Sequence, residues 1–238
     1  MFKKLFKSED IRRCVNPNFD ALPTYGHIFY FESSKEFIKG KVVLDVGCWT
    51  GQLEHLAYKS AKKMVGIDTN QQAIAFAKKN LPDVKFILAR AEKLPFSNSY
   101  FDTVLLIGVI EHVPKGSEKE VLRQIHRVLK PGGILILSTD NKNLLSIIFD
   151  PAYFLIGHRH YSMKEISKML TETGFKIRKK RFVGNVSGLI YSIVSLFFKY
   201  TLGFEPKYLQ RVKKFLLKEH AKEGFTHLYV VAETIKTN

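Results

Sequence analysis

Residues 42–52 of the chain read Val42-Val43-Leu44-Asp45-Val46-Gly47-Cys48-Trp49-Thr50-Gly51-Gln52. The run begins with apolar residues of high strand propensity, turns at one glycine and passes a second glycine into a segment with a helical pattern. A strand that turns on glycine into a helix is how a βαβ nucleotide-binding unit begins. The stretch therefore predicts an α/β fold with a ligand at the strand-to-helix turn.

The residue types in this turn indicate the chemistry of the ligand. Gly47 follows the strand directly, and the absence of a Cβ atom lets the backbone approach a ligand closely. Free backbone amides and the positive end of the following helix favour a carboxylate or a phosphate. Asp45, at the end of the strand, supplies an acceptor for an ammonium group. An ammonium group and a carboxylate together indicate an amino-acid moiety.

A second strand adds a site for a ribose. Residues 63–67 read as a strand that ends at Asp68, 21 residues after Gly47. A carboxylate at this place can accept hydrogen bonds from both hydroxyls of a ribose. A dinucleotide site would need the pattern Gly-x-Gly-x-x-Gly, whereas this chain has Gly47-Cys48-Trp49-Thr50-Gly51. The missing glycines leave poor room for a pyrophosphate.

Six motifs that occur in order along the chain carry a family resemblance. They are Leu44-Asp45-Val46-Gly47-Cys48-Trp49-Thr50-Gly51, Val65-Gly66-Ile67-Asp68, Ala91-Glu92-Lys93-Leu94-Pro95-Phe96, Phe101-Asp102-Thr103-Val104, Val109-Ile110-Glu111-His112-Val113 and Leu129-Lys130-Pro131-Gly132-Gly133. In this order they resemble the motifs of class I S-adenosylmethionine-dependent methyltransferases, and most of all the methyltransferase type 11 branch. The resemblance covers roughly residues 40–140 and implies S-adenosylmethionine as the cofactor.

The resemblance also implies which residues bind the cofactor. They follow successive strands of the fold and are Asp45, Gly47, Cys48, Gly51, Asp68, Thr69, Ala91, Glu92 and Ile107. Two positions depart from the pattern: Trp49 stands where the family usually has glycine, and Arg90 stands where it usually has an aspartate that accepts from the adenine amino group. Arginine has only donors, so that contact must be replaced or lost. Glu92 is either the replacement or a solvated surface residue.

Composition indicates one cytoplasmic domain. The chain has 238 residues, of which 45% are hydrophobic, and only two cysteines, Cys14 and Cys48, in unrelated contexts. Neither a disulfide framework nor a cysteine-rich metal site is indicated. Residues 1–7 are basic and apolar but are followed by no apolar core and cleavage site of a secretory signal. We expect an N-terminal cap segment at 1–40 and a methyltransferase domain at 41–238.

The alternation of patterns predicts a Rossmann-like, doubly wound fold. Strands are expected at 42–46, 63–67, 84–88, 103–107, 134–138, 175–182 and 226–233, and helices at about 33–39, 51–60, 70–80, 117–129 and 163–173. The resembled fold has a seven-stranded, mostly parallel sheet whose last strand is antiparallel. A helical insertion at about 183–224 is expected between the last two strands.

The positive charge is concentrated at the end of the chain. The whole chain carries a net charge of +16, and residues 151–238 hold 16 basic and 6 acidic side chains. Such an excess indicates an anionic partner, either nucleic acid or acidic lipid, although solubility alone is an alternative.

Three apolar segments lie in the same region. Residues 141–157 are strongly apolar and are expected to roof the substrate pocket. Residues 186–198 form an apolar run of 13 residues, which is short for a bilayer span and suits a buried or interfacial helix. Residues 206–222 place apolar side chains on one stripe of a basic helix, as a membrane-surface element does. A lid on its own domain and a homodimer contact are the alternatives.

Histidines near this roof are the candidate catalytic residues. Methyl transfer is an in-line displacement, and a base is needed only when the acceptor must lose a proton. His158, His160 and His112 are the candidates, with Tyr161 as an orienting group, and a purely structural role is the alternative for each. No metal site is expected, because the histidines lack companions at ligand spacing and the adjacent Glu111 and His112 would not normally share one ion.

These observations predict a methyltransferase that acts on a small, apolar or lipid-linked acceptor, with oxygen favoured over carbon or nitrogen. An anionic membrane surface and a second copy of the chain are the candidate partners. One alternative is an RNA methyltransferase, against which stands the lack of interleaved aromatic and basic residues. Another is a non-catalytic, S-adenosylmethionine-binding regulatory protein, which Trp49 and Arg90 allow. Asp45, Gly47, Gly51 and Asp68 together argue against that alternative.

Overall fold

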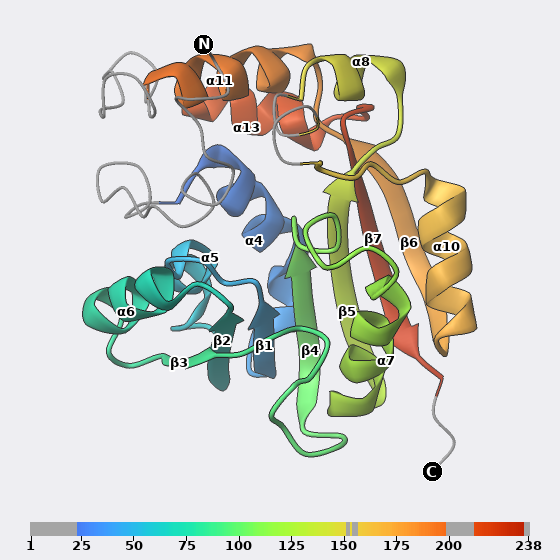
Figure 1. Ribbon diagram of the computed structural model, residues 1–238. Coiled ribbons are helices and arrows are strands. Elements are labelled where there is room, and N and C mark those ends of the chain that lie inside the picture. Colours follow the sequence, from blue (N-terminus) through green and yellow to red (C-terminus); the bar gives the residue numbers. More distant parts are fainter. Residues whose placement is uncertain (1–22, 151–152, 154–156, 199–211, 236–238) are drawn as a thin grey trace.

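Seven strands form one sheet in the order β3-β2-β1-β4-β5-β7-β6 (Figure 1). The computed structural model describes residues 23–150, 153, 157–198 and 212–235. Only β7 runs antiparallel to its neighbours. The strands are β1 (Val42–Val46), β2 (Lys63–Asp68), β3 (Lys85–Leu88), β4 (Phe101–Ile107), β5 (Leu129–Asp140), β6 (Phe175–Val183) and β7 (His227–Thr234). The predicted fold class is confirmed.

Helices cover both faces of this sheet. They are α4 (Tyr25–Ile38), α5 (Gln52–Ala57), α6 (Gln71–Asn80), α7 (Glu118–Val128), α8 (Leu144–Ile148), α10 (Met163–Glu172), α11 (Val186–Phe197) and α13 (Lys213–Ala221). Helices α4, α5 and α6 pack into one apolar core, and α7 and α10 pack into the other.

Alternate residues of the central strands enter opposite cores. In β4, Val104 and Leu106 lie in the core beneath α7, whereas Leu105 lies in the core beneath α4 and α5, and all three are fully buried. Successive strand side chains point to opposite faces, so a strand buried on both sides must be apolar at every position. This is why the central strands read as continuous apolar runs.

Side-chain caps fix where several helices begin. Asn70 caps α6 and Ser162 caps α10, so both helices begin close to their predicted starts. Helix α4, in contrast, begins at Tyr25, well before the predicted start at Ser33, because Thr24 and His27 form a capping box. A histidine in place of the usual glutamate hid this start in the sequence.

The Pro131-Gly132-Gly133 segment lies inside strand β5, although the sequence predicts it as a stop before the strand. Leu129 pairs with Phe101, and Ile134 pairs with Thr103, so the register between β4 and β5 shifts at this segment. A bulge of this kind absorbs extra residues without ending a strand.

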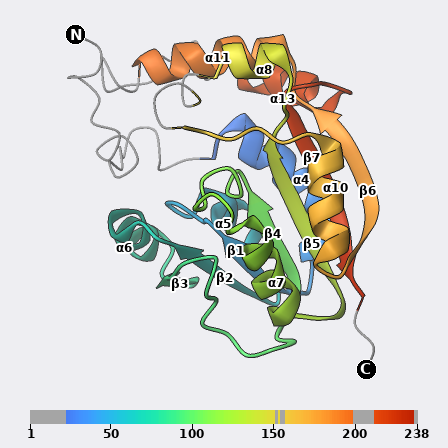
Figure 2. The same cartoon turned by 45° about the vertical axis from the view of Figure 1, so that its right-hand side comes forward.

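The helical insertion lies between β6 and β7, as predicted, and it packs on the N-terminal helix. Tyr25 of α4, Tyr191 of α11 and Leu216 of α13 form a small apolar cluster of their own. Both ribbon views place α8 and α11 at the same end of the molecule, near the carboxyl end of β5 (Figures 1 and 2). In the part of the chain that the structure describes, no helix has the length and apolar character needed to cross a membrane.

Candidate functional site

The predicted cofactor residues lie at the carboxyl ends of the parallel strands, where open α/β sheets bind their ligands. Asp45 lies near the end of β1, and the turn that follows carries Gly47, Cys48 and Gly51. Asp68 ends β2, and Thr69 follows it. The segment after β3 carries Ala91 and Glu92, and β4 ends at Ile107. The topology places β1 between β2 and β4, so these segments share one edge of the sheet.

Both glycines of the first turn are required by the backbone and by close neighbours. Gly47 has φ +83°, and a Cβ atom there would lie 2.3 Å from Cγ2 of Val109. Gly51 has φ +81°, and its Cβ would lie 2.9 Å from Cζ of Phe86. Trp49 has φ +47°, which is a left-handed conformation that a bulky residue rarely adopts. Strain of this kind clusters at functional sites.

The backbone amides of the turn are bonded within the protein. Gly47 and Cys48 both donate to the carbonyl of Ile67, at 2.8 and 2.9 Å, and Gly51 donates to Cys48 at 2.9 Å. The amide of Trp49 donates to Oδ2 of Asp68 at 3.0 Å. The expectation that this turn offers free amides to a ligand is therefore wrong for these four groups. Their hydrogen bonds fasten the turn to β2 instead, and polar recognition falls to the carboxylates.

Asp68 is held in one orientation by amides on both of its oxygens. Oδ2 accepts from Trp49, and Oδ1 accepts from the amide of Asn70 at 2.8 Å. Burial raises the pKa of this carboxyl group, and the amide hydrogen bonds partly offset that rise. Each carboxylate oxygen has a second lone pair, so Asp68 can still accept two hydroxyl groups of a ribose.

Two further carboxyl groups lie beside this turn. Asp45 is 4% exposed, and its burial and then the nearby Asp68 raise its pKa to about 7. Glu54 of α5 is fully buried, and within the described residues neither of its carboxyl oxygens has a hydrogen-bond partner. Burial, followed by the charge of Asp45, raises the pKa of Glu54 well above its usual value. The sequence analysis missed Glu54, whose only signal was an acidic residue on the apolar face of a helix.

The residues present fit S-adenosylmethionine. The acidic groups Asp45 and Asp68 suit a cofactor that carries a positive ammonium group, a positive sulfonium and two ribose hydroxyls. The space between Gly47 and Val109 is too small for a side chain at position 47. A glycine there lets the backbone of the turn lie close to the carboxyl edge of the sheet.

The segment after β3 carries Arg90 where the family usually has an aspartate. Arg90 forms an ion pair with Oε1 of Glu92 at 2.8 Å, and the Arg90 side chain is 64% exposed whereas that of Glu92 is 17% exposed. Ala91 between them is buried. The ion pair thus holds the carboxylate of Glu92, which is less exposed than its partner Arg90.

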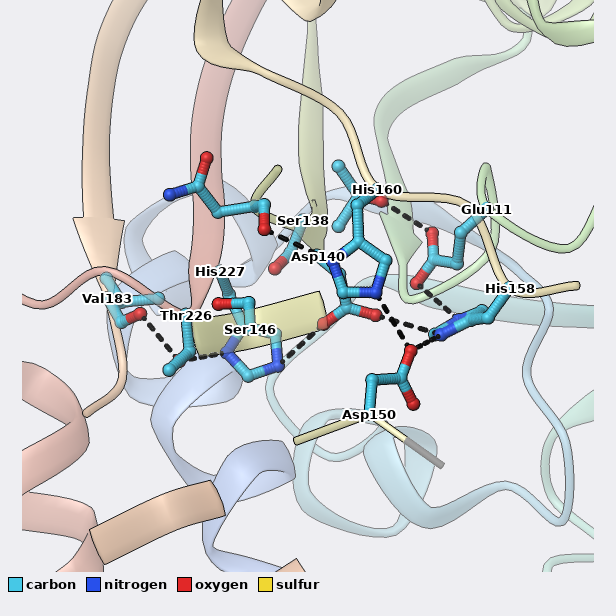
Figure 3. Close-up of polar contacts among 12 residues, drawn as sticks. Glu111, Ser138, Asp140, Ser146, Asp150, His158, His160, Val183, Thr226 and His227 are labelled. Atoms are coloured by element: carbon cyan, nitrogen blue, oxygen red, sulfur yellow. Dashed lines mark hydrogen bonds and ion pairs between the residues drawn. The ribbon is translucent and has the colours of Figure 1, made fainter. Parts of the chain in front are cut away.

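The three candidate histidines lie close together, and Figure 3 shows two of them, His158 and His160. His158 stacks on His112 with ring centroids 4.5 Å apart, and the rings of His158 and His160 lie 5.8 Å apart. His112 is exposed, whereas the side chain of His158 is 10% exposed and that of His160 is 2% exposed.

Two aspartates complete this cluster, and the sequence analysis did not identify either. Asp150 Oδ2 lies 2.6 Å from Nδ1 of His158 and 2.9 Å from Nε2 of His160, and Asp140 Oδ2 lies 3.3 Å from Nδ1 of His158. Burial lowers the pKa of both imidazoles, but the hydrogen bond to Asp150 and the neighbouring carboxylates outweigh it, so both pKa values are raised. Both imidazoles therefore hold a proton more readily than a solvent-exposed histidine does.

Tyr161 does not orient the histidines as predicted. Its hydroxyl contacts Oε1 of Glu118 at 3.0 Å and accepts from Nε of Arg159 at 2.8 Å. Arg159 also donates to the carbonyls of Ile110 and Val113. These contacts fasten the loop that carries Glu111 and His112 to the segment before α10.

Comparison with known proteins identifies relatives of this chain. A family model described as a methyltransferase domain matches residues 44–137. A ubiquinone biosynthesis O-methyltransferase of Rickettsia canadensis is 30% identical over 189 residues, which cover 72% of this chain and 75% of that protein. A probable S-adenosylmethionine-dependent methyltransferase of Mycolicibacterium smegmatis is 27% identical over 150 residues, which cover 63% of this chain and 58% of that protein.

Solved structures agree on the fold. The crystal structure of a SAM-dependent methyltransferase from Archaeoglobus fulgidus matches with a TM-score of 0.63 at 18% identity, covering 89% of this chain and 95% of that one. At this level of identity the likeness concerns the fold alone.

Proposed function

Because this chain belongs to the S-adenosylmethionine-dependent methyltransferases, we propose that it methylates an oxygen atom of an apolar or lipid-linked small molecule at a membrane surface. S-adenosylmethionine is the methyl donor of the family and supplies an electrophilic methyl group on its sulfonium. We infer that the carboxylates of Asp45 and Asp68 hold its ammonium group and its ribose, and that Glu92 accepts from the adenine.

Exposed apolar side chains on and beside α8 and α11, two helices at the same end of the molecule (Figures 1 and 2), carry this proposal. We call these side chains the apolar rim, and they are Leu144, Leu145, Ile148, Phe149, Val186, Ile190 and Ile193. Leu144 is 72% exposed and Ile190 is 56% exposed. Large side chains gathered in this way on a soluble domain indicate a contact with a membrane, a partner or an apolar ligand.

Basic residues near the apolar rim favour an anionic membrane as the contact. Exposed lysines on α13, just after it and before α8 are Lys214, Lys218, Lys222 and Lys142. Each basic residue close to an anionic bilayer contributes about 1 kcal/mol of attraction. An apolar stripe flanked by lysines is the pattern of a helix that lies in the membrane interface.

The name of one relative supports oxygen as the acceptor atom. The protein of Rickettsia canadensis is a ubiquinone biosynthesis O-methyltransferase, and it aligns with 72% of this chain. O-methylation of a hydroxyl group releases a proton, so a base close to that hydroxyl group accelerates the methyl transfer.

We infer that His112 accepts that proton. It lies on the same loop as Val109, whose side chain covers Gly47, and its ring stacks on His158. The amide of His112 donates to the carbonyl of Val109 at 2.9 Å, which ties the two residues together. His158 and His160 are buried against Asp150 and act as positioning residues in this proposal.

Flotation with vesicles tests the membrane part of the proposal. Wild-type protein is expected to float with phosphatidylglycerol vesicles and less with phosphatidylcholine vesicles. The double variant Leu144→Asp/Ile190→Asp should stay in solution while it still binds S-adenosylhomocysteine. Ile235→Asp is the matched control, because Ile235 is 62% exposed and follows β7, far from the rim in the sheet.

Two results would overturn the proposal. If wild-type protein remained in solution with both vesicle types, that result would exclude the proposed contact with a membrane surface. A gel shift with total RNA that survives 0.2 M salt, together with methyl labelling of the RNA, would favour the RNA methyltransferase instead.

A further inference from the structure

Four side chains from separate segments converge beside the histidine stack. Asp140 ends β5, Asp150 follows α8, and His158 and His160 precede α10. One atom of each lies within 4.8 Å of the corresponding atoms of the others. Figure 3 shows the carboxylates of Asp140 and Asp150 pointing at the two imidazole rings. We call these four residues the Asp–His cluster.

The outer ring nitrogens of both histidines face hydrogen-bond acceptors. Nδ1 of His160 lies 3.2 Å from the carbonyl of Asn141, which can only accept, so this nitrogen carries a hydrogen. Nε2 of His158 is buried without a hydrogen-bond partner among the described residues, and the carboxylate oxygen Oε1 of Glu111 lies 3.9 Å away. Histidines that bind metals almost always donate their second N–H to a carboxylate or a carbonyl in this way.

The inner nitrogens of both histidines lie close to the same carboxylate oxygen. Nδ1 of His158 and Nε2 of His160 lie 2.6 and 2.9 Å from Oδ2 of Asp150. Because Nδ1 of His160 carries the hydrogen, the lone pair of its Nε2 and the carboxylate repel at this distance unless positive charge lies between them. That charge is either a second proton on His160 or a single cation shared by the cluster, to which His158 can also offer Nδ1 when its hydrogen is on Nε2.

We propose that the Asp–His cluster binds one divalent transition-metal ion, with Zn²⁺ as the ion its chemistry favours. Two aspartates balance the charge of a divalent ion, and two neutral imidazoles with two carboxylates are ligands that Zn²⁺ accepts. Mg²⁺ and Ca²⁺ prefer all-oxygen sites, so the two imidazoles select against them. This proposal differs from the expectation from sequence that no metal site is present, which rested on residue spacing; Asp140 lies far from the histidines along the chain.

The spacing of the cluster suits a small ion after a modest adjustment. Bonds of about 2.0–2.1 Å to a tetrahedral ion separate its ligand atoms by about 3.3 Å. The separations between His158 or His160 and the aspartates are 2.6, 2.9 and 3.3 Å. A shift of His158 toward Glu111 lengthens the shortest of these and forms the hydrogen bond that Nε2 lacks.

A second hydrogen-bonded layer holds Asp140. Its Oδ1 lies 3.1 Å from Nε2 of His227, and Nδ1 of His227 lies 2.7 Å from the hydroxyl of Thr226. One oxygen of Asp140 is thereby anchored to β7, and the other, Oδ2, is presented to His158. Such outer contacts fix the orientation of metal ligands.

An ion in this cluster would lie next to the proposed acceptor. A divalent cation lowers the pKa of an oxygen bound to it, which favours the alkoxide or phenolate that attacks a methyl group. His112 is outside the ligand set and stays available to accept the proton. This role rests on the proposed function, whereas binding of the ion does not.

Calorimetry on tag-free, chelator-treated full-length protein tests the site. Titration with ZnCl₂ is expected to show one saturable site, and Co²⁺ should give the visible absorption of a tetrahedral complex. The double variant Asp150→Asn/His160→Gln should weaken Zn²⁺ binding at least 100-fold and abolish the Co²⁺ spectrum. His55→Gln is the matched control, since His55 is exposed on α5.

Titration with S-adenosylhomocysteine checks that each variant is folded. Should the double variant fail this check, Glu111→Gln, which changes the outer contact of His158 and leaves all four proposed ligands in place, is expected to weaken Zn²⁺ binding about 10–100-fold. No saturable Zn²⁺ binding to wild-type protein, or equal affinity in the folded variants, would overturn the metal site. Cofactor binding and vesicle flotation are separate measurements, so either result leaves the proposed function to its own test.

Discussion

The two halves of the sheet's carboxyl edge are built differently. The cofactor half comes from β1, the turn that follows it, and the end of β2. The backbone amides of that turn are bonded within the protein. The acceptor half gathers Glu111, Asp140, Asp150, His158 and His227 from segments far apart in the chain. We infer that the cofactor half is preformed and that the acceptor half depends on how α8 and the insertion are placed. Changes in one half should therefore leave the other half's binding unaltered.

The largest effect is expected from Asp68→Ala in the cofactor half. It removes two acceptors for ribose hydroxyls and the anchor for the amides of Trp49 and Asn70. Losing charge-assisted hydrogen bonds of this kind costs about 3 kcal/mol, so the Kd for S-adenosylmethionine should rise about 100-fold by calorimetry. Asp83→Ala, an exposed aspartate before β3, is the control. An unchanged Kd in Asp68→Ala would refute the ribose assignment.

A change in the acceptor half should spare the cofactor. His112→Gln removes the proposed proton acceptor, so kcat should fall about 100-fold while the Kd for S-adenosylmethionine stays the same. Steady-state kinetics with the identified acceptor measure this effect. Equal loss of cofactor affinity would mean that the two halves are not separable, and an unchanged kcat would exclude His112 as the base.

A smaller effect concerns the contact that joins the halves. Gly47→Ala places a Cβ atom 2.3 Å from Val109 in a left-handed backbone conformation. Overpacking of this kind lowers the free energy of unfolding by about 2 kcal/mol, which urea denaturation can measure. Val109→Ala in the same chain should restore part of the loss. A double variant no more stable than Gly47→Ala would show that backbone strain, and not the clash, is the cause.

The smallest effect is a pH-dependent change in stability at Glu54. Burial raises the pKa of its carboxyl group in the folded protein, so the unfolded state loses this proton at a lower pH than the folded state does. Stability is therefore lost as pH rises above the unfolded pKa. Glu54→Gln should raise the free energy of unfolding by about 1 kcal/mol or more at pH 7 and change it little at pH 4. Equal shifts at both pH values would contradict a protonated Glu54.

The fold of the cofactor half could be predicted from the sequence because its signals are local. Gly47, Gly51 and Asp68 lie where a strand-turn-helix unit needs them, and adjacent parallel strands bring them to one edge. The expectation of free backbone amides in the turn failed because a neighbouring strand accepts their hydrogen bonds. The carbonyl of Ile67 accepts from two amides of the turn, which no pattern within the turn reveals.

The acceptor half was only partly predictable. The histidines at 158 and 160 stand out in the sequence, but Asp140 and Asp150 become their partners only after α8 folds back over the sheet edge. Tyr161 is adjacent to His160 in sequence, yet its hydroxyl meets Arg159 and Glu118. Side-chain partners across segments follow from tertiary packing, which residue spacing alone does not encode.

One measurement tests the central claim most directly. Purified protein is incubated with methyl-labelled S-adenosylmethionine and a total lipid extract in vesicles, and the label is followed into organic solvent. The proposed function predicts label in the organic phase with wild-type protein and none with Asp68→Ala. Label that enters RNA in a parallel incubation, or no transfer to lipid by a protein that binds the cofactor, would contradict it.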